Sequence, residues 1–345
     1  MTAGPGGAEP APAAERSGPW RDRPVTVRVP ATSANLGPGF DALGLALGLH
    51  DEVRAWVTSG GLEIEVAGVG EQTARCGEQH LVVRAMRAAF DVLGGQPPGI
   101  RLRCVNAIPH GFGLGSSAAA IVAGILAARG LRIGGEEELP GDAVLRLAAD
   151  LEGHADNVAA CLAGGLTIAW RGGGGRDRGP GAGTGAGGGA GGLTRSIRLD
   201  PLLGLTPVLC VPAVPLATEA ARRVLPTAIP HADAAKNAAR AALLVAALTQ
   251  GPPPTEPGIL VDATEDFLHQ PYRAGSMPHT AELVRDLRRA GVPAAVSGAG
   301  PAVLALILPG ASAGPDAVAA VAAESGHDWT VRVLSVDREG ATVRL

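Results

Sequence analysis

Lysine is nearly missing from this chain of 345 residues: Lys236 is the only one, and arginine supplies the rest of the positive charge. Phosphate-binding motifs that depend on a lysine are therefore excluded. The chain has no G-x-x-x-x-G-K-[ST] sequence, no VAIK lysine and no HRD loop of the protein-kinase type. Any phosphate bound here must be neutralised by backbone N–H groups, arginines or a metal ion.

Aromatic residues and long apolar runs are also scarce. Aromatics make up 3% of the chain while hydrophobic residues make up 46%, so the expected core consists of Ala, Val, Leu and Ile. No apolar stretch approaches the ~20 residues that a membrane-spanning helix needs. The net charge is -4 without a basic run, which argues against a nucleic-acid surface.

The four cysteines lack the spacing of metal ligands, which favours buried reduced thiols in a cytoplasmic protein. They are Cys76, Cys104, Cys161 and Cys210. The first residues lack a charged start followed by an apolar run, so no secretory signal is expected. Residues 1–24, rich in Pro, Gly and Ala near their start, are expected to form a disordered tail.

Hydrophobic periodicity predicts strands alternating with helices in both halves of the chain, an α+β protein of two domains. Strands are expected from Val25 (VTVRVP), over 100–105, in GGLTIAW, over 207–214, on both sides of SGAGP, and in TVRVL and ATVRL; helices are expected over 81–93, 116–129, 143–163, 233–248 and 281–290. Gly130 is the expected C-terminal cap of the second helix. We assign residues 25–192 and 193–345 to the two domains, with the glycine-rich segment 172–192 as a flexible surface loop.

The segment PHGFGLGSSAAAIVAGILAA, residues 109–128, carries the strongest chemical signal. A glycine-rich turn opens into a helix, so the first helical N–H groups and the positive end of the helix dipole are available to an anion. The hydroxyls of Ser116 and Ser117 lie at the cap and first turn, within reach of phosphate oxygens or Mg²⁺. Local physics alone leaves open a plain serine-capped helix.

The same segment resembles the ATP-binding motif of the GHMP kinases. Two further blocks resemble that superfamily in the expected order: PATSANLGPGFDALGLAL at residues 30–47 and SGAGP at residues 297–301. The form of the first block, and of EGHADNVAACLAGG at residues 152–165, resembles the homoserine-kinase branch. The resemblance covers nearly all of the chain outside the tail and the glycine-rich segment.

The resemblance implies an N-terminal domain like ribosomal protein S5 domain 2 and a ferredoxin-like C-terminal domain. It implies that ATP is bound by Pro109, His110, Gly111, Phe112, Gly113, Leu114, Gly115, Ser116, Ser117, Ala118 and Ala119. Glu152 resembles the Mg²⁺-binding carboxylate, partnered by Ser117 or Ser116, and hard oxygen ligands suit that ion. Because the spacing before HADN varies in the family, Asp150 is the alternative ligand.

For the substrate, the resemblance implies L-homoserine, phosphorylated on its side-chain hydroxyl to O-phospho-L-homoserine in threonine biosynthesis. Asn35 and Asp41 resemble the residues that hold its polar end, with Asp41 paired to the ammonium group. Arg222 and Arg273 resemble arginines that grip its carboxylate. His154 and Asn157 are expected to line the same pocket, and Asn157 to orient the hydroxyl.

Two features depart from the family or stay open. His80 stands where the family usually has Asn near the adenine, which bears on nucleotide preference. A mevalonate-type kinase, which typically has a lysine near the first block, and a non-catalytic GHMP-fold ligand sensor are the competing hypotheses. A homodimer and inhibition by threonine are plausible from the family, but no residue of this sequence tests either.

Overall fold

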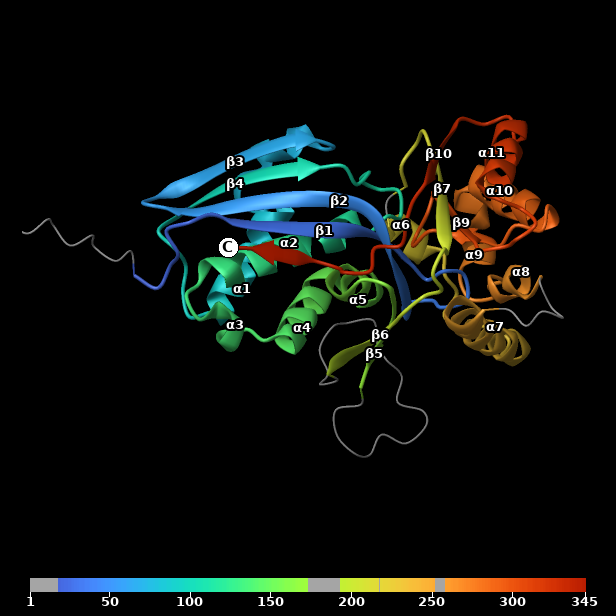
Figure 1. Ribbon diagram of the computed structural model, residues 1–345, viewed down its shortest axis with the longest axis horizontal. Coiled ribbons are helices and arrows are strands. Elements are labelled where there is room, and N and C mark those ends of the chain that lie inside the picture. Colours follow the sequence, from blue (N-terminus) through green and yellow to red (C-terminus); the bar gives the residue numbers. More distant parts are fainter. Residues whose placement is uncertain (1–17, 173–192, 217, 252–257) are drawn as a thin grey trace, which may run out of the picture.

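The computed structural model describes residues 18–172, 193–216, 218–251 and 258–345. These residues form two sheets, each covered by helices, side by side along the long axis of the molecule (Figure 1). The predictions for residues 1–17 and for 173–192 lie outside the described residues. Among the described residues, no helix combines the length and apolar character needed to cross a membrane.

The first sheet has seven strands in the order β11-β1-β2-β4-β3, with β5 paired to β2 and β6 paired to β5. Its strands are β1 (Val25–Ala34), β2 (Leu43–Thr58), β3 (Gly61–Gly68), β4 (Gly99–Asn106), β5 (Leu166–Arg171), β6 (Thr194–Leu199) and β11 (Thr342–Arg344). The start of β1 buries every second residue, as its alternation predicts. Beyond Pro30, where the register with β2 shifts, β1 is buried throughout and carries the first motif block into the interior.

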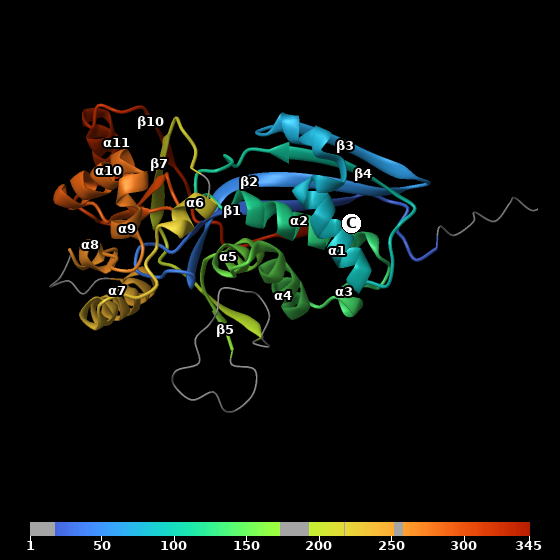
Figure 2. The ribbon, with the colours of Figure 1, turned by 180° about the vertical axis from the view of Figure 1, so that it is seen from behind.

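Five helices cover one face of this sheet, and the view from behind shows the same layering (Figures 1 and 2). They are α1 (Leu81–Val92), α2 (Ser116–Leu131), α3 (Gly135–Glu138), α4 (Gly141–Glu152) and α5 (Asp156–Ala163), preceded by the 3-10 segment η1 (Glu71–Gln79). Helix α2 packs against α1, α4, α5, β1 and β2. Its alanines and glycines permit that close approach on several sides.

The second sheet has the order β10-β7-β9-β8 with antiparallel pairs throughout. Its strands are β7 (Thr206–Pro212), β8 (Ala294–Val296), β9 (Val303–Ile307) and β10 (Trp329–Val333), packed against α10 (Pro278–Arg289) and α11 (Pro315–Glu324). This β-α-β-β-α-β arrangement is ferredoxin-like, as expected. Between β7 and α10 lie α6 (Thr218–Arg223), α7 (His231–Gln250), α8 (Ile259–Ala263), α9 (Gln270–Arg273) and η2 (Ala274–Ser276).

Three sequence-based expectations need correction. Order begins before Val25, because Trp20 is buried edge-on against Phe90 at 5.2 Å. The division at residue 193 differs from the sheets: β6 and the C-terminal β11 both belong to the first sheet, so the two bodies separate between β6 and β7. Gly130 does not cap α2 but lies within it, where its missing side chain makes room for Val25.

The cysteines are free thiols, and three of them are buried as expected. Burial raises the pKa of Cys104 and of Cys210 to about 12, so these thiols are unreactive packing residues. Cys76 differs from the expectation, because it is exposed.

Candidate active site

The three motif blocks, far apart in the sequence, meet at the junction of the two bodies. At the end of β1, the Thr32 N–H donates to the Leu114 carbonyl (3.1 Å), and the Ala34 carbonyl accepts from the Gly298 N–H (3.0 Å). The Ser297 hydroxyl bonds the Gly113 carbonyl at 2.8 Å. A side chain at Gly113 would collide with the backbone of Ser297, so glycine is required for this contact.

A cavity of about 460 Å³ lies where these loops meet. Its lining consists of Ala34, Asn35, Gly111, Gly113, Leu114, Gly115, Ser116, Ser117, Glu152, Gly153, His154, Asp156, Asn157, Arg222, Arg273, Gly298 and Ala299. A second cavity of about 360 Å³ shares Ser116 and Ser117 with the first and runs between β1, β2, β4 and α1 toward His80 and His110. The two cavities therefore meet at the start of α2.

The N-terminus of α2 is open to a ligand. Gly115 precedes the helix with φ 66°, and no side chain caps it. The first helical hydrogen bond runs from the Ala119 N–H to the Gly115 carbonyl (2.9 Å), so the N–H groups before it have no intrahelical partner. Helix N-termini of this kind attract anions, phosphate above all.

Ser117 and Glu152 form a pair of oxygen ligands beside this helix end. The Ser117 hydroxyl donates to Oε1 of Glu152 at 2.6 Å. Glu152 is the last residue of α4, which Gly153 ends in the left-handed conformation at φ 92°. Burial raises the pKa of the Glu152 carboxyl, against the lowering effect of Ser117 and His154. A carboxylate held in this way gains from a cation, and the donor set suits Mg²⁺.

Asp156 is a site residue that the sequence analysis missed. The residue is 1% exposed, and Oδ1 accepts hydrogen bonds from the Asn157 N–H and the His154 ring, both at 2.8 Å. Although burial opposes protonation of His154, the hydrogen bond and charge of Asp156 raise its pKa above the usual value. Asn157 is fixed by Thr32, whose hydroxyl donates to its amide oxygen at 2.8 Å. The sequence signal that could have identified Asp156 is its position as the acidic residue of the HADN segment.

Two of the predicted substrate residues, Asp41 and Arg222, pair with each other. The Arg222 guanidinium binds Asp41 with two hydrogen bonds, of 2.6 and 3.2 Å. Arg273, 1% exposed, donates to the Ala221 carbonyl at 3.0 Å and lies over the Phe40 ring, as Arg222 does. Burial and the positive charge of Arg222 lower the pKa of Arg273. Both arginines line the cavity.

Some expected residues lie differently. Asp41 does not line the cavity; it binds Arg222, which does. Asn35 lines it, yet its amide is engaged, donating to the Gly298 carbonyl at 2.8 Å and accepting from the Asp41 N–H at 3.0 Å. Pro109, Phe112 and Ala118 line neither cavity. Asp150 is exposed and is absent from both linings.

His80 ends the second cavity. Its side chain is buried, and Nδ1 is a buried atom without a hydrogen-bond partner. Burial and the nearby His110 lower the pKa of His80, so the ring is neutral near pH 7. A buried polar atom that lacks a partner costs free energy, which a bound ligand with a complementary group can recover.

Comparison with known proteins identifies the family. The family models described as GHMP kinases N terminal domain and GHMP kinases C terminal match residues 80–165 and 254–325. The homoserine kinase of Streptomyces coelicolor is 51% identical over 94% of this chain and 96% of its own length, and that of Clavibacter michiganensis is 47% identical over 94% and 95%. The crystal structure of homoserine kinase from Cytophaga hutchinsonii superposes with a TM-score of 0.71 at 26% identity, covering 94% of this chain and 98% of that one. This chain belongs to the homoserine kinase family of the GHMP kinases.

Proposed function

We propose that this protein transfers the γ-phosphoryl group of ATP to the side-chain hydroxyl of L-homoserine, giving O-phospho-L-homoserine and ADP in the cytoplasmic synthesis of threonine. One observation carries the proposal: a single cavity joins an uncapped helix N-terminus to two arginines, Arg222 and Arg273. The helix N-terminus suits phosphate, and the pair of arginines suits a carboxylate. The relatives named homoserine kinase support the choice of amino acid.

For ATP, the phosphates occupy the N-terminus of α2 and the base occupies the second cavity. Supporting this, the two cavities share Ser116 and Ser117, so one ligand can span both. The backbone N–H groups at the helix start take the part that lysine plays in other nucleotide sites. His80 lines the part of the second cavity assigned to the base, with a neutral ring whose Nδ1 has no partner within the protein.

Glu152 and Ser117 are the proposed ligands of Mg²⁺. Their oxygens lie 2.6 Å apart at the edge of the phosphate site, and both are of the hard type that this ion prefers. When bound, the ion neutralises charge that develops on the phosphate oxygens. Asp150, the alternative ligand, is disfavoured because its exposed side chain faces neither cavity.

At the substrate end, Arg222 and Arg273 hold the carboxylate of homoserine and Asp41 its ammonium group. Before substrate binds, Asp41 and Arg222 neutralise each other as an ion pair. The zwitterionic substrate can replace this pair, with its ammonium group bound to Asp41 and its carboxylate bound to Arg222. The Thr32 hydroxyl occupies the amide oxygen of Asn157, which leaves the amide nitrogen to orient the substrate hydroxyl. Phosphoryl transfer has a loose transition state, so this positioning, without a strong general base, accounts for catalysis.

The two competing hypotheses are less well supported. A mevalonate-type activity would need a lysine near the first motif block, and this chain has none there: Lys236 is its only lysine and lies on α7, paired with Asp233. A non-catalytic sensor would be expected to have lost the phosphate loop or the metal carboxylate. Here Ser117 and Glu152 are joined by a hydrogen bond beside an open helix end.

The test is ADP release by purified protein with Mg-ATP and L-homoserine, with L-serine, L-threonine and mevalonate as comparison substrates. Turnover with homoserine, and at least about 100-fold lower kcat/KM with the others, is expected because their chain length or charge does not match the arginines and the phosphate site together. Turnover with mevalonate instead would overturn the substrate. ATP binding without turnover of any alcohol would favour the sensor.

A further inference from the structure

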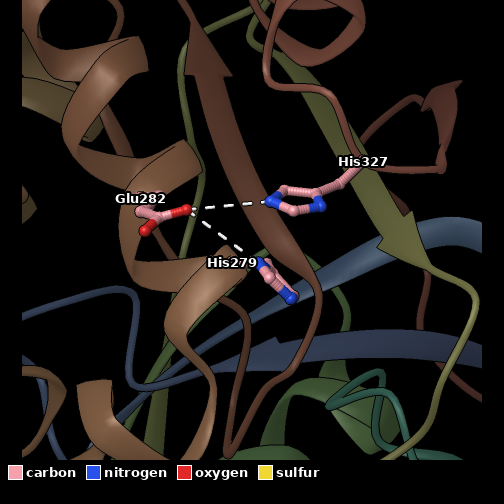
Figure 3. Close-up of side chains that lie close together, drawn as sticks. All are labelled: His279, Glu282 and His327. Carbon is pink, nitrogen blue, oxygen red and sulfur yellow. Dashed lines mark ion pairs between the residues drawn. The ribbon is translucent and has the colours of Figure 1, made fainter.

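A second cluster of ligand-type side chains lies on the ferredoxin-like body, away from the catalytic cavity. His279 and Glu282 are on the first turns of α10, three residues apart and so on one face of the helix. His327 comes from the loop between α11 and β10. Figure 3 shows both histidine rings turned toward the Glu282 carboxylate. None of the three residues lines either cavity of the active site.

The separations within this cluster are somewhat wider than those of ligands around a bound ion. Glu282 Oε2 lies 3.9 Å from Nδ1 of His279 and 3.7 Å from Nε2 of His327, too far for hydrogen bonds. One atom from each residue lies within 4.8 Å of the other two. Two ligands bound at ~2.0–2.1 Å in a tetrahedral site stand ~3.3 Å apart. Small rotations of the three side chains are therefore enough to bring their ligand atoms within coordination distance of one ion.

The side chains are free to make that adjustment while their backbones are held. The side chains of His279 and Glu282 are 59% and 50% exposed. The helix turn that carries them is fixed by Thr280, whose hydroxyl donates to the Pro301 carbonyl at 2.7 Å. The loop of His327 is fixed by the Ser325 hydroxyl, which accepts from the Trp329 indole at 3.1 Å.

The donor set selects the class of ion. Two imidazoles and one carboxylate make a His₂Glu set, which binds Zn²⁺ and leaves a fourth position open. Imidazole suits Zn²⁺, Co²⁺, Ni²⁺ and Cu²⁺, whereas Mg²⁺ prefers oxygen and water. The cluster is thus chemically distinct from the Ser117–Glu152 oxygen pair. We propose that His279, Glu282 and His327 form a binding site for a transition-metal ion of the Zn²⁺ type, which links α10 to the loop before β10.

The test measures Zn²⁺ binding by equilibrium dialysis on the full chain, without a histidine tag and in buffer containing Mg²⁺. The parent carries Cys76→Ser, because Cys76 shares the nucleotide cavity with His80 and His110 and could form a competing thiol site. One equivalent of Zn²⁺ is expected to bind the parent. Glu282→Gln and His327→Ala should each weaken it at least about tenfold, while His231→Ala, which changes an exposed histidine on α7, should not.

Two further readouts separate a built site from a surface ion. Zn²⁺ should raise the Tm of the parent in a concentration-dependent way and raise the Tm of Glu282→Gln less at the same Zn²⁺ concentration, since an ion stabilises only the state that binds it. Co²⁺ should give the intense visible bands of a four-coordinate complex in the parent alone. If the parent and both cluster variants bind Zn²⁺ equally, or Co²⁺ stays six-coordinate, the cluster holds an adventitious ion only and the proposal is wrong.

Discussion

At the scale of single residues, Glu152 lines the cavity and is hydrogen-bonded to Ser117 at 2.6 Å. Changing Glu152→Gln keeps the shape and removes the charge. We expect kcat with Mg-ATP to fall at least about 100-fold, since a bound metal supplies several kcal/mol of charge stabilisation. Steady-state kinetics against Mg²⁺ concentration measure this. Asp150→Asn, on the same helix but exposed, is the matched control and should stay active. If Asp150→Asn is inactive and Glu152→Gln is active, the metal ligand is Asp150.

The same carboxyl gives a prediction for pH. Burial raises the pKa of Glu152, so protons compete with Mg²⁺ for it at a higher pH than for an exposed glutamate. At limiting Mg²⁺, activity should fall as the pH drops through this raised pKa, and added Mg²⁺ should shift the fall to lower pH. A pH–rate profile at two Mg²⁺ concentrations measures the shift. An acid limb that does not respond to Mg²⁺ belongs to another group.

Asp41 supports a prediction about the substrate. Replacing Asp41→Asn removes the partner of Arg222 and of the substrate ammonium group. Charged hydrogen bonds contribute about 1.5–3 kcal/mol, so the KM for homoserine should rise about 10- to 100-fold while the KM for ATP stays the same. Initial-rate kinetics with each substrate varied in turn separate the two constants. An equal rise in both would show that Asp41 acts on the fold of the site rather than on homoserine.

His80 makes the complementary prediction for the nucleotide. His80 lines the second cavity and its Nδ1 has no partner, so His80→Ala should raise the KM for ATP several-fold, the value of one neutral hydrogen bond of about 0.5–1.5 kcal/mol. The KM for homoserine should not change. The same kinetic experiment provides the readout, and an unchanged KM for ATP would place the base elsewhere.

Most individual site residues were predictable because they sit in motif blocks, as Ser117, Glu152 and Asn157 do. Apart from the Ser117–Glu152 pair, their partners were not predictable. The pairing of Asp41 with Arg222 joins residues 181 positions apart, and the Thr32–Asn157 bond joins residues 125 apart. No local pattern encodes such contacts, which depend on how β1, α5 and α6 are brought together.

At the scale of elements, the turn before α2 controls the phosphate site. Gly113 has φ 75°, and a Cβ added there would meet the Ser297 carbonyl and the Gly300 backbone, whereas Gly94 after α1 has φ 84° and open space where its Cβ would lie. Gly94→Ala should cost only the backbone strain of about 1–2 kcal/mol. Gly113→Ala adds a collision between two motif blocks, so it should lower Tm further and weaken ATP binding. Thermal unfolding and ATP titration compare the two, and equal effects would contradict the role of this contact.

Hydrophobic periodicity predicted the positions of helices and strands where the local sequence preference agrees with the final fold. The helix over 81–93 and the strands on both sides of SGAGP match α1, β8 and β9 closely. Errors arose where long-range packing overrides local preference. Gly130 continues α2 because Val25 fills the space beside it, and the ATSA residues after VTVRVP extend β1 because β2 pairs with them.

At the scale of the whole molecule, the chain returns to its first sheet at the end, where β11 pairs with β1. The division at residue 193 could not foresee this, since sequence order does not reveal which sheet a late strand joins. Deleting residues 341–345 uncovers the edge of β1 and part of the core around Val343, so Tm should fall by several degrees. Removing the exposed Leu345 alone should have little effect. Equal Tm values for both truncations would contradict the role of β11.

The central claim is that the two ends of one cavity bring ATP and the hydroxyl of homoserine together. The most direct measurement is ³¹P NMR of the product formed from Mg-ATP and L-homoserine, with Glu152→Gln as the inactive control. We expect a phosphomonoester on the side-chain oxygen of homoserine, formed together with ADP. Inorganic phosphate alone, or a phosphate on the carboxyl group, would contradict the proposed placement of homoserine between the arginines and the start of α2.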